Sequence, residues 1–223
     1  VTRVTDLTDR SVSGYMWATN ERLLYVRDFG GDENYHILAV NIDGSDNVDL
    51  TPFEKVQAGL IDDLENDEEH VLVSLNTRDP QCFDPYRLNI VTGELTILAE
   101  NPGYITSWMT DHDGKLRLAT ATDGVNTSIL YRNTEAEEFQ NVLTTNFRES
   151  VSPLFFTFDN QHVYASSNLG RDKAAIVKFD IENGQEIEVL FSHDEVDVSG
   201  LSYSKKRQVL TTISYTTWKR QFH

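Results

Sequence analysis

A repeat of 43 to 48 residues constrains the fold of this chain more than any other feature of its sequence. Strand-like segments that contain a leucine motif recur around Leu7, Leu50, Leu98, Leu143 and Leu190, so successive leucines are 43, 48, 45 and 47 residues apart. The blades of β-propellers repeat with a period of roughly 40 to 50 residues. The sequence therefore predicts an all-β chain built of propeller blades.

Each repeat contains four strand-like pieces in the same order. The first piece opens on small residues, as in VSGYMW, AGLIDD and VSGLSY, and small residues suit the crowded start of an innermost strand. The other pieces alternate apolar with polar residues and are rich in β-branched and aromatic side chains, whereas no stretch shows a helical period. We predict four-stranded antiparallel blades over residues 12–51, 58–99, 104–144, 151–191 and 197–223, the last of them incomplete.

The predicted strands amount to about five blades. Residues 1–8 are interpreted as one further strand of the outermost type, which could complete the last blade and close a five-bladed ring. A larger propeller that is cut inside a blade would give the same number of strands. The sequence leaves open whether the chain is a truncation, a processed fragment or a closed five-bladed propeller.

The connections between strands are of two kinds. Short segments such as DHDGK and IDGS are typical of hairpin turns, because Gly and Asn accept the positive φ that tight turns need. The connections after the second strands, such as DFGGDEN and SNLGRDKA, are longer and more polar. Alternating strand direction places these loops and the inter-blade links at one end of each blade, which we call the long-loop end. Because loops on a rigid scaffold usually carry function, this end is the candidate functional surface.

Seven charged residues of these loops are candidates for controlling substrate access or for contacting another domain. Acidic side chains there could receive an ammonium or guanidinium group, and arginines could receive a carboxylate. The alternative is that the charged groups, with Asp84 among them, pair with one another between neighbouring blades or contact another domain. The candidates are Asp28, Asp32, Glu33, Arg78, Asp79, Arg171 and Asp172.

No motif of an active site occurs in the sequence. It contains no G-x-S-x-G nucleophile elbow, no P-loop, no dinucleotide fingerprint after a strand and no H-E-x-x-H zinc motif. The six scattered histidines and the single cysteine, Cys82, are interpreted as structural. Asp111 and Asp113 lie where a tight turn is expected and lack the distal glutamate of a calcium loop. We expect no catalytic residue, metal or cofactor in this chain.

The charge of the chain disfavours two classes of partner. With 19 Lys and Arg against 36 Asp and Glu, the formal net charge is −17, which opposes binding to nucleic acid or to an anionic membrane. A solvated surface, as in a salt-adapted protein, also explains this acidity. No apolar run approaches the ~18 residues of a membrane span, and the first residues lack the apolar core of a signal peptide. We expect a soluble, cytoplasmic protein, with a secreted or periplasmic location open if the true N-terminus is missing.

Three segments resemble a known family. They are LLYVRDFGGDENYHILAVNIDGSDNVDLTPF, SLNTRDPQCFDPYRLNIVTGEL and SNLGRDKAAIVKFD, and they resemble the propeller domain of the prolyl oligopeptidase family of serine peptidases, particularly its acylaminoacyl-peptidase-like bacterial members. The likeness covers nearly the whole chain. In that family a propeller, commonly of seven or eight blades, precedes an α/β-hydrolase domain and covers its active site, so that only short peptides or peptide ends enter.

The resemblance implies a function for the chain without chemistry of its own. None of the family's Ser, Asp and His can be assigned to these residues, so the hydrolase domain is expected outside this sequence, in the same parent protein or on a separate chain. The chain would then gate and select short peptides for that domain. The alternatives are a stand-alone protein-binding or scaffold propeller and, disfavoured by the lack of motifs, an enzyme with its site inside the propeller.

The repeat also makes a structural prediction. Leu24, Val73, Leu118 and Val163 occupy equivalent positions in the second pieces of four repeats. We expect all four side chains to be buried in second strands.

Overall fold

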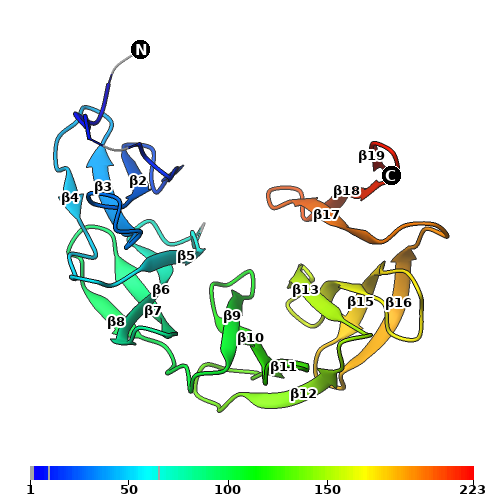
Figure 1. The fold of residues 1–223 in the computed structure, drawn as a ribbon. Helices are drawn as coiled ribbons and strands as arrows, with labels where there is room; N and C mark the ends of the chain where they lie inside the picture. Colours follow the sequence, from blue (N-terminus) through cyan, green and yellow to red (C-terminus); the bar gives the residue numbers. More distant parts are fainter. Residues whose placement is uncertain (1–2, 10, 65) are drawn as a thin grey trace. The chain divides into compact units, whose positions relative to one another are not determined.

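A computed structural model describes residues 3–9, 11–64 and 66–223, and these residues form 19 β-strands and no helix (Figure 1). The strands pair in chain order into four sheets of four strands and one sheet of three. The strand pairs of blades 1, 2, 4 and 5, and those of β10 to β12, are antiparallel, as expected for hairpin-connected blades. The all-β propeller-blade fold that the repeat predicts is therefore confirmed.

Each sheet corresponds to one repeat, and we number the sheets as blades 1 to 5. Blade 1 contains β1 (Gly14–Trp17), β2 (Arg22–Arg27), β3 (His36–Asn41) and β4 (Val48–Asp49). Blade 2 contains β5 (Ala58–Asp62), β6 (His70–Asp79), β7 (Cys82–Asn89) and β8 (Leu95–Ile97). Blade 3 contains β9 (Ile105–Thr110), β10 (Leu116–Thr122), β11 (Thr127–Tyr131) and β12 (Gln140–Thr145). Blade 4 contains β13 (Val151–Phe156), β14 (Val163–Ser167), β15 (Ala175–Asp180) and β16 (Gln185–Phe191), and blade 5 contains β17 (Val198–Ser204), β18 (Val209–Thr216) and β19 (Arg220–Phe222).

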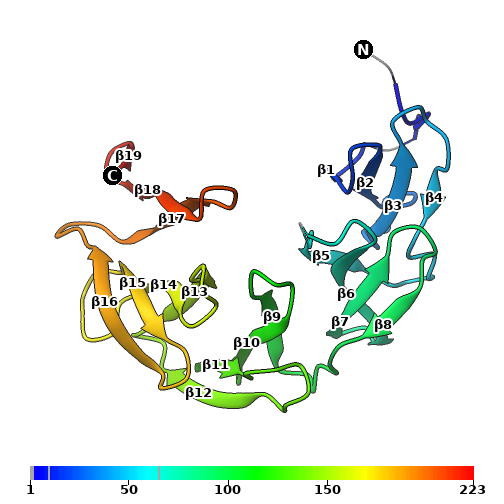
Figure 2. The same cartoon turned by 180° about the vertical axis from the view of Figure 1, so that it is seen from behind.

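The blades divide between two compact units. The first unit, Val1–Ile105, holds blades 1 and 2, and the second, Thr106–His223, holds blades 3 to 5. Within each unit the blades follow one another in chain order, which the reverse view in Figure 2 also shows. The residues that the structure describes form no helix that is long and apolar enough to cross a membrane.

Each unit has a core made by the middle strands of its blades. In the first unit Leu24 of β2 and Val73 of β6 belong to one buried cluster. In the second unit Leu118 of β10 and Val163 of β14 belong to another. All four side chains are at most 2% exposed, which confirms the expectation from the repeat. Burial of such apolar side chains stabilises each by roughly 1.5–3 kcal/mol relative to exposure, so the core positions fix which face of each strand points inward.

The small residues of the first strands differ in how closely they are packed. A Cβ atom on Gly200 of β17 would lie 2.0 Å from Ser214 Oγ, and one on Gly59 of β5 would lie 3.0 Å from Ser74 Oγ. A Cβ atom on Gly14 of β1, in contrast, would meet nothing within 4 Å. The predicted crowding of the first strand is thus correct for blades 2 and 5 and wrong for blade 1.

The strand predicted over residues 1–8 is not formed in the described part of that segment, residues 3–8. Arg3 takes two backbone carbonyls of the segment for its own side chain, because its Nε donates to Thr5 O (2.6 Å) and its Nη2 to Leu7 O (2.8 Å). Val4 and Leu7 pack against an apolar cluster of blade 1. The described residues of this segment belong to none of the five sheets, and closure of a five-bladed ring by this segment stays a prediction.

Candidate functional site

Backbone hydrogen bonds fasten the long loops to the strands that begin beside them. In the first unit Ala58 N, at the start of β5, donates to Tyr35 O at 2.7 Å. In the second unit Val198 N, at the start of β17, donates to Ala174 O at 2.9 Å. The loop after the second strand of blades 1 and 4 is thus attached to the first strand of the following blade. The long-loop end is held by the sheets, as its predicted role requires.

The loop RDFGGDEN of blade 1 folds around its own acidic residues. Gly30, Gly31 and Glu33 all have positive φ, of 70°, 85° and 60°, which turns the chain sharply. Asp32 accepts hydrogen bonds from Asn34 N (3.1 Å) and Asn34 Nδ2 (3.0 Å), and the bond from the Asn34 side chain is the main cause that lowers the Asp32 pKa. Asp28 is buried, and its Oδ2 accepts from Glu33 N at 3.4 Å. Asp32 and Glu33 are exposed, as predicted for a loop tip.

Arg78 of blade 2 is engaged within its own blade. Its Nε and Nη2 donate to the two carboxylate oxygens of Asp84 at 3.1 and 3.0 Å, and Nη2 also donates to Asn101 O. Asp84 is fully buried and additionally accepts from Asn101 N at 2.6 Å. Asp79 accepts from Gln81 N at 2.8 Å and so forms the turn between β6 and β7. The carboxylate that Arg78 was expected to receive is supplied by the chain itself.

Arg171 of blade 4 has the same arrangement. Its Nη1 and Nη2 donate to the two oxygens of Glu186 at 2.8 and 2.6 Å, and Nη2 also donates to Ser167 O at 3.1 Å. Asp172 is exposed and pairs with Lys173 at 3.1 Å. Both predicted carboxylate-receiving arginines therefore form bidentate pairs inside one blade, rather than between neighbouring blades.

The DHDG segment forms the tight turn that its sequence predicts. Asp111 Oδ1 accepts from Asp113 N (2.9 Å) and Lys115 N (3.0 Å), while its Oδ2 pairs with Arg117 Nη1 at 3.1 Å. Both oxygens of Asp111 thus bind groups of the protein. Cys82 is buried at the start of β7, and its thiol is free.

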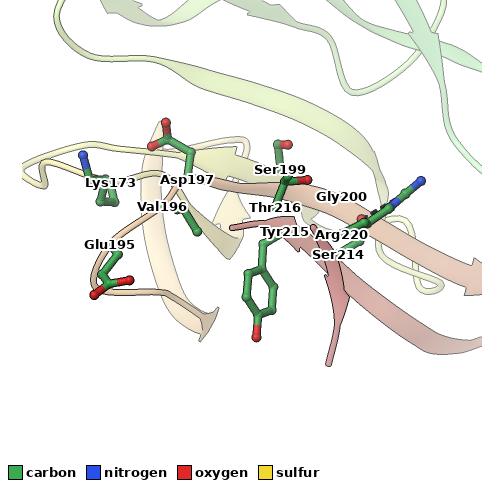
Figure 3. A pocket seen from close by; sticks show the side chains of 10 residues that line it. All are labelled: Lys173, Glu195, Val196, Asp197, Ser199, Gly200, Ser214, Tyr215, Thr216 and Arg220. Carbon is green, nitrogen blue, oxygen red and sulfur yellow. Dashed lines mark hydrogen bonds between the residues drawn. The ribbon is translucent and has the colours of Figure 1, made fainter. Parts of the chain in front are cut away.

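A pocket of about 600 Å³ lies at the long-loop end of the second unit, between blades 4 and 5 (Figure 3). The loop after β14 contributes Lys173, the link before β17 contributes Asp197, and β19 contributes Arg220. In Figure 3, Lys173 and Asp197 lie together at one end, Arg220 lies at the other, and Ser199 lies between them. The pocket is thus lined by opposite charges that are separated by hydroxyl groups.

Arg220 is the functional candidate that the sequence analysis missed. Its Nη2 donates to Ser214 Oγ at 3.2 Å and its guanidinium lies over the Phe222 ring at 5.4 Å. In the part of the chain that the structure describes, no carboxylate lies within 4.0 Å of it. A signal was present in the sequence, because residues 198–223 contain five of the 19 basic residues and none of the 36 acidic ones.

Comparisons with known proteins find similarity in sequence to a peptidase. The chain is 32% identical over 207 residues to the dipeptidyl aminopeptidase BIII of Pseudoxanthomonas mexicana, a match that covers 88% of this chain and 29% of the relative. The chain therefore spans less than a third of the length of that relative. No family model matches the sequence.

Solved structures share the fold at low sequence identity. The prolyl oligopeptidase B of Galerina marginata matches 85% of this chain and 30% of its own length with a TM-score of 0.59 and 12% identity. The TolB structure from Acinetobacter baumannii matches 94% of this chain and 51% of its own length with a TM-score of 0.60 and 15% identity. These likenesses support the propeller fold.

Proposed function

We propose that this chain is a propeller segment of the prolyl oligopeptidase family and that it selects short peptides for a hydrolase domain elsewhere in the full protein. The observation that carries this proposal is the 32% identity to a dipeptidyl aminopeptidase across 88% of the chain. Because the match covers only 29% of that relative, most of the relative's length is left to carry the chemistry.

The selection requires no catalytic group in this chain. Loops that are held by the sheets would keep the entrance to the hydrolase active site at a constant width, and a narrow entrance would exclude folded proteins. Exposed charges at the loop tips, such as those of Asp32 and Glu33, would attract or repel the charged ends of a peptide. A propeller of this kind would thus affect which substrates reach the nucleophile rather than the chemical step.

A stand-alone binding propeller is the alternative function. The fold similarity to TolB, at a TM-score of 0.60, is compatible with it because a shared fold does not by itself imply peptidase activity. In this case the long-loop end would bind a protein partner, and the full protein would carry no hydrolase domain.

The two functions differ in the activity of the complete gene product. We would express the complete reading frame and, separately, residues 1–223, and assay both on dipeptidyl chromogenic substrates. The proposal predicts hydrolysis by the complete product that a serine-directed inhibitor abolishes, and no hydrolysis by residues 1–223. A reading frame without a G-x-S-x-G segment, or a complete product without peptidase activity, would refute it in favour of the binding propeller.

A further inference from the structure

We propose that the pocket in Figure 3 binds the free carboxylate of a short peptide, with Arg220 as the principal donor. This inference rests on the proposed function and deepens it, because it names a part of the substrate that the long-loop end would hold. The pocket volume of about 600 Å³ lies within the range of roughly 300–1,000 Å³ that is usual for small-ligand sites.

The state of Arg220 differs from that of the other two arginines considered. Arg78 and Arg171 each form a bidentate pair with a carboxylate of their own blade. Among the residues that the structure describes, the partners of Arg220 are the Ser214 hydroxyl and the Phe222 ring. A guanidinium presents several donors in a planar fork that matches a carboxylate. Arg220 can therefore form, with the carboxylate of a ligand, the bidentate pair that Arg78 and Arg171 form with carboxylates of the protein.

The strands of blade 5 hold Arg220 beside further polar groups. Arg220 opens β19 and pairs in register with Thr216 of β18, which places it next to the pocket wall. Ser214 Oγ accepts from its Nη2 at 3.2 Å, which limits the directions that the guanidinium can take. Ser199 and Thr216 add hydroxyl groups that can donate to a second carboxylate oxygen. The lining thus supplies a guanidinium and hydroxyl groups as hydrogen-bond donors to a carboxylate.

The lining of the pocket is less acidic than the chain as a whole. It contains two basic residues, Lys173 and Arg220, and two acidic ones, Glu195 and Asp197, whereas the whole chain has a net charge of −17. Long-range repulsion of anions is screened within a Debye length of about 8–10 Å at ordinary salt. A short-range contact with Arg220 can therefore bind a carboxylate that the whole molecule would repel.

The opposite end of the pocket restricts the ligand to one carboxylate. Lys173 at that end pairs with Asp172 at 3.1 Å, and Asp197 accepts a hydrogen bond from Ala174 N at 2.8 Å. Glu195 also lines the pocket there and is exposed. These carboxylates would repel a second anionic group and attract an ammonium group. A peptide with both termini free has the charges that fit the two ends.

The test compares two ligands that differ only at the C-terminus. Binding of Ala-Ala-Ala and of Ala-Ala-Ala amide to residues 1–223 would be measured by calorimetry or by NMR titration at pH 7. Amidation removes the negative charge and leaves the peptide net positive, so attraction to the acidic chain alone would strengthen binding of the amide. A site for the free carboxylate predicts the reverse, with binding of the amide weaker by about tenfold or more, because hydrogen bonds between charged groups are the strong ones.

Two variants assign the effect to Arg220. Arg220→Gln should weaken binding of the free tripeptide by about tenfold, and thermal unfolding of this variant should match the parent. Arg148→Gln is the matched control, because Arg148 is also exposed and lies over the Phe147 ring at the same 5.4 Å, but does not line the pocket. The control variant should bind within about twofold of the parent.

Three results would overturn the assignment. These are no binding of the free tripeptide at 10 mM, equal binding of acid and amide, or equal losses in the Arg220 and Arg148 variants. The measurement needs only residues 1–223, so it is independent of the peptidase assay on the complete product. Failure here leaves the proposed function standing, whereas a complete product without peptidase activity would leave a carboxylate site but remove its role in holding a substrate.

Discussion

At the scale of single residues, most charged side chains of the long loops bind groups of their own loop or blade. Arg78 and Arg171 each donate hydrogen bonds to a carboxylate of the same blade, and Asp32 accepts a hydrogen bond from Asn34 N. The sequence predicted which loops carry these charges, because loop composition is local. It could not predict the pairings, since Arg171 and Glu186 are 15 residues apart and meet only when the blade has formed.

Asp123, in the loop between β10 and β11, provides a test of this local pairing. Its Oδ1 accepts from Asn126 N (2.7 Å) and Val125 N (2.9 Å) and its Oδ2 from Asn126 Nδ2 (2.8 Å), and these bonds, led by that of Asn126 N, lower the Asp123 pKa to about 2. The ordinary value is about 4, so the bonds stabilise the fold above pH ~4 and this contribution is lost as the pH falls toward ~2.

Removing the side-chain donor should raise this pKa. Asn126→Ala deletes one of the three donors and keeps the two backbone donors, so the Asp123 pKa should rise partway toward the ordinary value in an NMR titration of carboxyl carbons. Asp180, whose pKa is lowered chiefly by the Asn183 side chain, is the internal control and should not change. A parent chain in which Asp123 titrates at about 4 would contradict this hydrogen-bond pattern.

Arg78 gives a second prediction at this scale. Arg78→Ala leaves the fully buried Asp84 carboxylate without its bidentate partner, although Asn101 N still donates to it. The Arg78 side chain is 41% exposed, so the pair is only partly buried, but the buried Asp84 carboxylate loses two hydrogen bonds and we expect the free energy of unfolding by urea to fall. Arg148→Ala, which removes an exposed arginine, should cost less than about 0.5 kcal/mol. Equal costs for the two variants would show that the Asp84 pair contributes nothing.

At the scale of elements, the repeat was sufficient to predict the blades, and packing decided the details. The period and the alternation of apolar residues predicted all five sheets and the burial of the second strands. The strand over residues 1–8 was not formed in its described part, where the Arg3 side chain binds the carbonyls of Thr5 and Leu7. The pocket was missed because Lys173 and Arg220 are 47 residues apart in the sequence and line one site only through the packing of blades 4 and 5.

Contact between neighbouring blades can be tested at the β15–β16 hairpin. Gly184 in this turn and Gly170 in the loop after β14 have almost the same φ, 65° and 64°. Substitution by alanine therefore introduces a similar backbone strain at either position. A Cβ atom on Gly184 would lie 2.2 Å from Val142 O of blade 3, whereas one on Gly170 would meet nothing within 4 Å.

The two alanine variants should therefore differ in stability. We expect Gly184→Ala to lower the free energy of unfolding by about 1–3 kcal/mol more than Gly170→Ala, because the backbone of blade 3 must move to admit the methyl group. Urea denaturation of both variants measures the difference. Equal losses would mean that the hairpin of blade 4 does not approach β12 as closely as the structure places it.

At the scale of the whole molecule, the proposed function depends on the share of the relative that the chain matches. The match to a dipeptidyl aminopeptidase covers 88% of this chain but 29% of that enzyme, and no active-site motif occurs in the sequence. The proposed role is selection of substrates, to which the exposed charges of the loop tips, such as those of Asp32 and Glu33, would contribute. Selection by size is the property that separates this role from that of an independent binding propeller.

Dependence of cleavage on substrate length tests this role most directly. With the complete gene product, kcat/KM would be measured for one N-terminal dipeptide carried first on a short chromogenic peptide and then on an unfolded chain of about 60 residues. If the propeller controls access, kcat/KM should fall by at least about tenfold for the long chain, although the cleaved bond is the same. Equal kcat/KM for the two substrates would contradict selection by the propeller.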